Sequence, residues 1–203
     1  MRTRAAGALV GCLLLAACSS SDPGGGSAAT PAAGAAWRTV TDRATGISFR
    51  LPQTPTVQSK AATVAGIPVD RRTYSVTSPD PLAKTGLGTA VTIETATDAR
   101  ATKSWPLDAL PQQYIDQLST DGASDAVVLE KRTLQVAGRP ALSFRFRFTP
   151  PQGGPVVWLA CAIDAGRALV IAETIGFPDG SHEQALLAEE RPVQAKLVAG
   201  ITV

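Results

Sequence analysis

Residues 139–174 read RPALSFRFRFTPPQGGPVVWLACAIDAGRALVIAET, which is three apolar runs separated by the turn segments PPQGG and DAG. Apolar and polar side chains alternate in the first run, as in a strand with one buried face. The apolar set is Leu142, Phe144, Phe146 and Phe148, and the polar set is Ser143, Arg145, Arg147 and Thr149. The second run, 155–163, is apolar at both parities, which predicts a central strand covered on both faces. Glycine-rich turns connect antiparallel strands, so the stretch predicts a meander.

The preceding sequence predicts further strands, four of which form two hairpins. Their ranges are 37–40 with 47–51, 56–64 with 67–77, 89–96, and 126–137 with an interruption around 130–132. The alternation slips between Val69 and Tyr74, which predicts a bulge near Arg71 and Arg72.

Two segments have helical periodicity instead. In the first, Leu107, Leu110, Tyr114 and Leu118 form one apolar stripe, with Gln113 on the opposite side. Asp108 is a candidate cap, Pro111 fits a first turn and Gly122 is a candidate end of this helix.

The second helix is expected to begin at Ser181 with a capping-box pattern, to restart at Pro192 and to end at Gly200. Strands in hairpins and a meander, combined with two helices, predict an α+β fold in which the helices pack on an antiparallel sheet.

The N-terminus predicts a secretory signal over residues 1–17. Arg2 and Arg4 precede an apolar run that is too short to span a bilayer, and the run ends in Leu-Ala-Ala-Cys at Cys18. This ending resembles the lipobox of bacterial lipoproteins, which implies that Cys18 is acylated. We therefore expect a lipid-anchored protein on the extracytoplasmic face of the bacterial cell membrane. The alternative is an ordinary signal peptide in which Cys18 has no role.

The 18 residues after Cys18, SSSDPGGGSAATPAAGAA, predict a flexible tether with a reach of roughly 23 Å. A single domain is expected over 37–203. Of the 19 basic residues, Arg2 and Arg4 leave with the signal, which gives 17 basic and 17 acidic residues in the mature chain. This balance argues against a nucleic-acid partner. Cys12 also leaves with the signal and Cys18 is expected to be acylated, so Cys161 has no intrachain disulfide partner.

Several short segments resemble the PsbP-like α/β sandwich, a group that includes photosystem-associated proteins and many bacterial lipoproteins. They are Gly46-Ile47-Ser48-Phe49-Arg50-Leu51-Pro52, Val136-Ala137-Gly138-Arg139-Pro140-Ala141, Gly166-Arg167-Ala168-Leu169-Val170-Ile171 and the C-terminal helix. The resemblance covers most of 37–203 and implies accessory or binding roles. It carries over no catalytic residues.

Candidate reactive residues are few. His182 is the only histidine, which excludes a multi-histidine metal site within one chain, and we expect it to be a solvated first-turn residue. Cys161 shares the parity of Val157, Leu159 and Ile163, so we expect a buried thiol with the role of a small hydrophobe. No common serine-hydrolase, dinucleotide or phosphate-loop motif is present. We expect no catalytic residue, cofactor or metal.

Two features can be read as binding surfaces. Arg145 and Arg147, with Lys131, Arg132 and Arg139 nearby, form either an anion-binding patch or a solvated sheet face balanced by Glu130 and Glu173. Trp37 and Trp105 are either binding aromatics or anchors for a terminus and a loop, and we expect anchors.

Three functions remain open at this point. The first is a non-catalytic binding or accessory domain of the cell envelope, with a protein or lipid partner. The second is a lipid or glycolipid carrier, which needs an apolar cavity between the sheet and the helices. The third is an enzyme that uses scattered carboxylates. Neither the ligand nor the oligomeric state follows from the sequence, and the first function is the one we expect.

Overall fold

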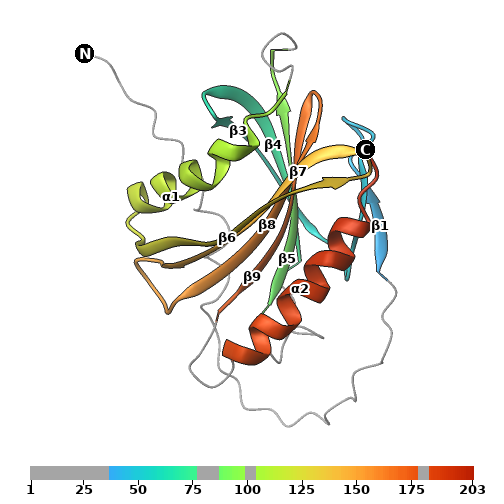
Figure 1. The fold of residues 1–203 in the computed structure, drawn as a ribbon. Coiled ribbons are helices and arrows are strands. Elements are labelled where there is room, and N and C mark those ends of the chain that lie inside the picture. Colours follow the sequence, from blue (N-terminus) through green and yellow to red (C-terminus); the bar gives the residue numbers. More distant parts are fainter. Residues whose placement is uncertain (1–36, 77–86, 99–103, 178–182) are drawn as a thin grey trace, which may run out of the picture.

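A computed structural model of the chain describes residues 37–76, 87–98, 104–177 and 183–203. Within them, seven antiparallel strands form one sheet in the order β3-β4-β5-β9-β8-β7-β6, with a helix on each face (Figure 1). The strands of this sheet are β3 (Thr56–Val64), β4 (Ile67–Val76), β5 (Gly88–Ala96), β6 (Ser124–Val136), β7 (Arg139–Thr149), β8 (Val156–Ala165) and β9 (Ala168–Gly176). The predicted α+β fold is confirmed.

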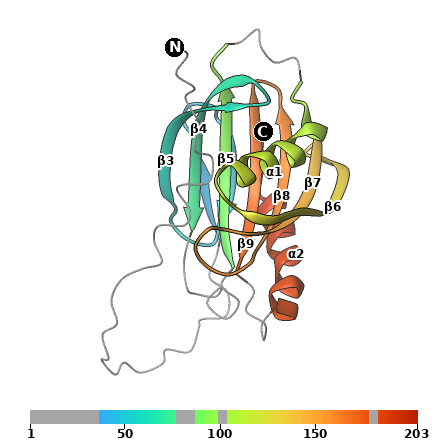
Figure 2. The ribbon, with the colours of Figure 1, turned by 90° about the vertical axis from the view of Figure 1, so that its left-hand side faces the viewer.

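The meander of residues 139–174 forms β7, β8 and β9 as predicted, and β8 lies inside the sheet with both of its faces buried. One face is covered by α1 (Leu110–Thr120), which follows the short helix η2 (Leu107–Ala109). The other face is covered by α2 (Glu183–Ala199) and by a separate hairpin of β1 (Arg38–Thr41) and β2 (Ser48–Leu51). Figure 2 shows α1 in front of the sheet and α2 behind it.

The α1 face contains a large aromatic core. Leu110, Tyr114 and Leu118 are buried as the predicted stripe requires, while Leu107 is half-buried. The Tyr114 ring lies 5.1 Å from the Trp158 ring and 5.9 Å from that of Phe146, within the range of favourable aromatic pairs. These rings fix α1 across β7 and β8.

The ends of α1 agree only in part with the sequence expectations. Pro111 lies in the first turn and Gly122 follows the helix with a φ of +88°, both as predicted. Asp108 makes no capping bond; its carboxylate instead lies 3.1 Å from Lys131 Nζ. Gln113 does not face solvent opposite the core, because its Oε1 accepts a hydrogen bond from the Ala65 N–H in the β3–β4 turn.

Helix α2 corrects a second expectation, since it continues through Pro192 without a restart. Proline removes one backbone donor, but its side chain is exposed here, and Leu186 and Leu197 on either side of it are fully buried. Packing of the flanking turns therefore offsets the local preference. The helix ends before Gly200, as predicted, where an added Cβ would lie 2.9 Å from Arg50 Cβ.

The expected bulge near Arg71 and Arg72 is wrong. β4 keeps an uninterrupted register with both of its neighbours, and the two arginines point to opposite faces of the sheet. Arg71 Nε lies 2.5 Å from Glu94, and Arg72 Nε lies 2.6 Å from Asp42 in the β1–β2 hairpin. Because each arginine is paired with a carboxylate, the two side chains can be covered on opposite faces of the sheet, and the strand needs no shift in register.

The Asp42 contact attaches the β1–β2 hairpin to the sheet. Burial raises the pKa of Asp42, but the Arg72 guanidinium and the N–H groups of Ala44 and Thr45 outweigh burial and lower the pKa overall. The irregularity expected around residues 130–132 lies slightly earlier in β6: the register shifts between Val128 and Glu130, whereas residues 130–132 pair regularly with β7.

Candidate functional site

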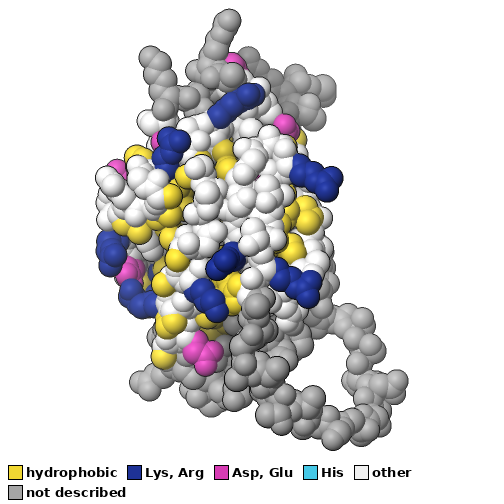
Figure 3. Space-filling model, turned by 90° about the vertical axis from the view of Figure 1, so that its right-hand side faces the viewer, with side chains coloured by type: hydrophobic (Ala, Val, Ile, Leu, Met, Phe, Trp, Pro, Cys, Tyr) yellow, Lys and Arg dark blue, Asp and Glu magenta, His cyan; other side chains and the backbone are white. Residues whose placement is uncertain are grey.

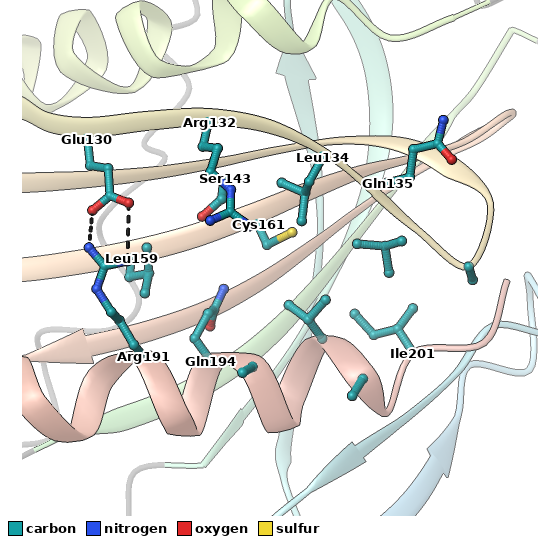
Figure 4. Close-up of a pocket in the computed structure, with 15 residues that line it drawn as sticks. Glu130, Arg132, Leu134, Gln135, Ser143, Leu159, Cys161, Arg191, Gln194 and Ile201 are labelled. Carbon is teal, nitrogen blue, oxygen red and sulfur yellow. Dashed lines mark hydrogen bonds and ion pairs between the residues drawn. The ribbon is translucent and has the colours of Figure 1, made fainter.

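A groove of about 620 Å³ lies between α2 and strands β6, β7 and β8 (Figure 4). Strand β6 forms one wall, α2 forms the other, and β7 and β8 form the floor. The lining residues on the sheet are Glu130, Arg132, Leu134, Gln135, Val136, Ala137, Ser143, Leu159 and Cys161. Those on and after α2 are Arg191, Gln194, Ala195, Val198, Ala199 and Ile201.

Strand register divides the groove into a polar end and an apolar end. Glu130, Arg145 and Leu159 form one row across β6, β7 and β8, and Arg132, Ser143 and Cys161 form the next. The third row is Leu134, Ala141 and Ile163. Side chains in register on one face are immediate neighbours, so polarity falls from row to row along the groove.

The two walls meet at the polar end through an ion pair. Arg191 Nη2 of α2 lies 2.5 Å from Glu130 Oε2 of β6, and Nη1 lies 3.2 Å from Oε1 (Figure 4). The contact is bidentate, which fixes its geometry. Because the Arg191 side chain is 58% exposed, the pair contributes little to stability. It orients the walls instead.

A second pair lies deeper. Arg145 Nη1 lies 3.3 Å from Glu190 Oε2, and the Glu190 carboxyl is fully buried beneath α2. Burial raises the pKa of Glu190 to about 7, against opposing contributions from Arg145 and Arg191. Gln194 is also buried, and its Nε2 donates to the Ala172 carbonyl at 2.8 Å. These contacts hold α2 on the sheet beside the groove.

Cys161 is buried on the groove floor, as the parity of β8 predicted. Burial raises the pKa of this thiol to about 12, so the reactive thiolate is scarce at neutral pH. Because the Cys161 side chain is small, it leaves space in the groove over strand β8.

The sequence reasoning missed a polar cluster on the opposite, α1 face. It consists of the buried Arg71–Glu94 pair, with Thr92 and Glu173 nearby. Burial raises the pKa of Glu173 to about 7, which the Thr92 hydroxyl, Arg71 and Trp158 partly oppose. Glu173 alternates in phase with Ile171 on β9, and Thr92 and Glu94 alternate in phase with Ala96 on β5. Alternation alone therefore does not distinguish these polar residues from core positions.

The predicted arginine patch is not a uniform solvated face. Arg145 is largely covered and pairs with Glu190, whereas Arg147 is exposed. Glu130 pairs with Arg191 instead of balancing the patch, and Glu173 lies on the opposite face of the sheet. On the face shown in Figure 3, the Lys and Arg side chains are dispersed among other residues.

Both tryptophans expected to be anchors make such contacts. Trp105 is buried, and its indole N–H donates to the Gly166 carbonyl at 2.9 Å, which ties the segment before α1 to the β8–β9 turn. Trp37 is half-buried, with Lys196 Nζ of α2 4.7 Å from its ring centre.

Other candidate residues lie outside the described part of the chain. They are the lipid attachment site Cys18 and His182 with the capping box at Ser181. In the described ranges no three His, Cys, Asp or Glu side chains are placed to hold a metal ion. No helix there is long and apolar enough to cross a membrane.

Comparison with solved structures identifies the fold. The solution structure of cyanobacterial PsbP (CyanoP) from Synechocystis sp. PCC 6803 matches at 13% identity and a TM-score of 0.52, over 86% of this chain and 97% of that one. The chain therefore has a PsbP-like α+β fold. Protein of unknown function PA94 from Pseudomonas aeruginosa matches at 10% identity and a TM-score of 0.43, over 82% of this chain and 96% of that one.

Comparisons at the level of sequence identify no relative. No family model matches the chain, and no curated protein matches it.

Proposed function

We propose that this chain is a cell-envelope lipoprotein, anchored through Cys18, whose domain binds an amphipathic small molecule without transforming it. The groove between α2 and β6–β8 is the observation that carries the proposal. Its volume lies within the usual range for pockets that take small ligands. Of the functions that the sequence leaves open, the groove favours a lipid carrier over an accessory domain that uses only its surface loops.

The side chains of the groove support binding over catalysis. Cys161 has a raised pKa, and the Glu130 carboxylate is engaged by Arg191, so neither is poised as a nucleophile or a general base. What remains is a short polar section followed by aliphatic side chains, the arrangement that suits one molecule with a polar head and an apolar chain.

Membrane attachment supports the same role. An acylated Cys18 followed by the tether would keep the groove within a short distance of the lipid surface. Detergent phase partitioning tests the anchor: the wild type should enter the detergent phase and Cys18→Ala should stay in the aqueous phase. Equal partitioning of the two would refute the lipoprotein assignment.

The groove has a separate test. Native mass spectrometry of protein purified from a bacterial envelope should show a stoichiometric adduct of lipid size, removed by organic solvent. Ala195→Trp adds bulk to an exposed groove position of α2 and should abolish the adduct. Ala188→Trp, exposed on the same helix but outside the groove lining, is the matched control and should retain it. A wild-type protein without adduct, or an adduct unaffected by Ala195→Trp, would count against the groove.

A further inference from the structure

One guanidinium in the groove has no salt-bridge partner among the described residues. Arg132 projects from β6 into the groove, where its neighbour in register on β7 is Ser143 (Figure 4). The other two arginines at this end differ, since Arg191 is paired with Glu130 and Arg145 with Glu190. Arg132 is exposed, so a ligand can reach its charge.

The charge at the polar end is therefore not balanced by the protein. Arg132, Arg145 and Arg191 carry three positive charges, and Glu130 and Glu190 carry at most two negative ones. The net charge is +1 with both carboxylates ionised, and protonation of Glu190 makes it more positive. A single negative charge on a ligand neutralises this end, and a planar guanidinium matches the two oxygens of a carboxylate.

Beyond Arg132 the groove becomes apolar. Leu134 and Val136 of β6 face Val198 and Ile201 across it. Arg132 and Val136 are four residues apart on one strand, so this section is about 13 Å long. The length and volume suit one aliphatic chain.

Resting on the proposed binding function, we propose that the groove takes a single-chain amphiphile with a carboxylate head group, of the fatty-acid type. The head group contacts the Arg132 guanidinium and the Ser143 hydroxyl, and the chain runs between β6 and α2 toward Ile201. The ion pair between Glu130 and Arg191 holds the two walls together beside the head group.

Isothermal titration calorimetry with three ten-carbon amphiphiles, each below its micellar concentration, tests the assignment. The probes are decanoate, decyl glucoside and decyltrimethylammonium, which differ in head-group charge. The protein is the mature chain from residue 18 with Cys18→Ser, so that no attached acyl chain competes for the groove. The wild-type groove should bind decanoate about tenfold more tightly than decyl glucoside, the size expected for one charge-assisted contact, and the cationic probe most weakly.

Arg132→Gln should remove the preference for decanoate and leave the affinity for decyl glucoside unchanged. Arg147→Gln is the matched control, because Arg147 is an exposed arginine on the neighbouring strand outside the groove lining, and it should keep the preference. Acetate at the same concentration should not displace decanoate, because it lacks the chain; displacement by acetate would reduce the site to a simple anion site and overturn the proposal.

The remaining outcomes separate this inference from the function on which it rests. If decyl glucoside binds as tightly as decanoate and Arg132→Gln changes nothing, while Ala195→Trp still blocks both, the groove is a binding site but the carboxylate assignment is wrong. If no probe binds, or if Ala195→Trp blocks none of them, the proposed function itself fails.

Discussion

Each face of the sheet is covered by one helix, and the groove described above lies on the α2 face. On the α1 face the helix lies against Phe144, Phe146 and Trp158, and each of these rings contacts that of Tyr114. On the α2 face the corresponding rows carry Ala141, Ser143 and Cys161, and the helix presents Ala195 and Ala199. Large rings fill the first interface, while small side chains leave the second open.

The difference separates stability from binding. Buried aromatic rings contribute the most apolar area per residue, so the α1 face should provide most of the stability of the domain. The α2 face has less of this aromatic packing. Specific contacts, such as the ion pair between Arg145 and Glu190, hold α2 on the sheet. If this division is right, substitutions on the two faces should differ in the size of their effect on stability and in the measurement that detects them.

The largest effect is expected on the α1 face. Phe146 is fully buried and its ring contacts three other aromatic rings, so Phe146→Ala should lower the free energy of unfolding by about 3–5 kcal/mol. Urea denaturation measures this loss. Ala195→Gly on the open face, which removes one exposed methyl from a helix, should cost no more than about 1 kcal/mol. Equal losses would contradict the division.

A second effect should appear with pH. The pKa of Glu173 is raised to about 7 in the folded protein, so the folded state holds this proton more tightly than the unfolded state. The stabilisation is complete below the unfolded pKa of about 4.5 and is lost as pH rises to 7, on the order of 3 kcal/mol in all.

Denaturation curves between pH 4.5 and 7.5 measure this slope. Glu173→Gln should flatten it, since glutamine mimics the protonated carboxyl and does not titrate. Glu190→Gln should flatten it as well, because the pKa of Glu190 is also raised to about 7. A slope of the opposite sign in the wild type would show that both carboxyls are ionised throughout this range.

The groove floor predicts a smaller effect. Cys161→Ser places a hydroxyl among apolar neighbours and should cost roughly 1–3 kcal/mol. In the wild type a thiol reagent should modify Cys161 slowly at neutral pH and rapidly in denaturant. Rapid modification of the native protein would mean that the groove opens down to its floor.

The smallest effect is expected at the ion pair that joins the two walls. A double-mutant cycle with Glu130→Gln and Arg191→Gln should give a coupling energy of about 0.2–1 kcal/mol, as for other exposed pairs. A coupling above 2 kcal/mol would show that the pair stabilises the domain and does more than orient the walls.

The elements of the fold were predictable because their signals are local. Alternation identified the meander, and the spacing of Leu110, Tyr114 and Leu118 identified the buried side of α1. The parity of β8 also predicted that Cys161 is buried. Each of these patterns depends on a period of 2 or 3.6 residues, which a short stretch of sequence contains in full.

The errors occurred where distant residues override a local rule. A bulge near Arg71 and Arg72 was predicted because the apolar alternation slips between Val69 and Tyr74, but each arginine has an acidic partner more than 20 residues away, so both faces of a regular strand are covered. Pro192 suggested a break in the helix, but buried leucines on both sides hold α2 together. Neither the partners nor the packing can be recognised from the neighbouring sequence.

The sequence by itself determined the strands, the helices, the α+β class and the burial of Cys161. Only the tertiary structure decided where the candidate site is, because the groove exists only once α2 lies beside β6, and these elements are separated by nearly 50 residues and three strands. Strand register then places Arg132 beside Ser143 and leaves its charge without a partner in the described chain. Register and helix placement are fixed by contacts between distant segments, so no local pattern encodes the groove.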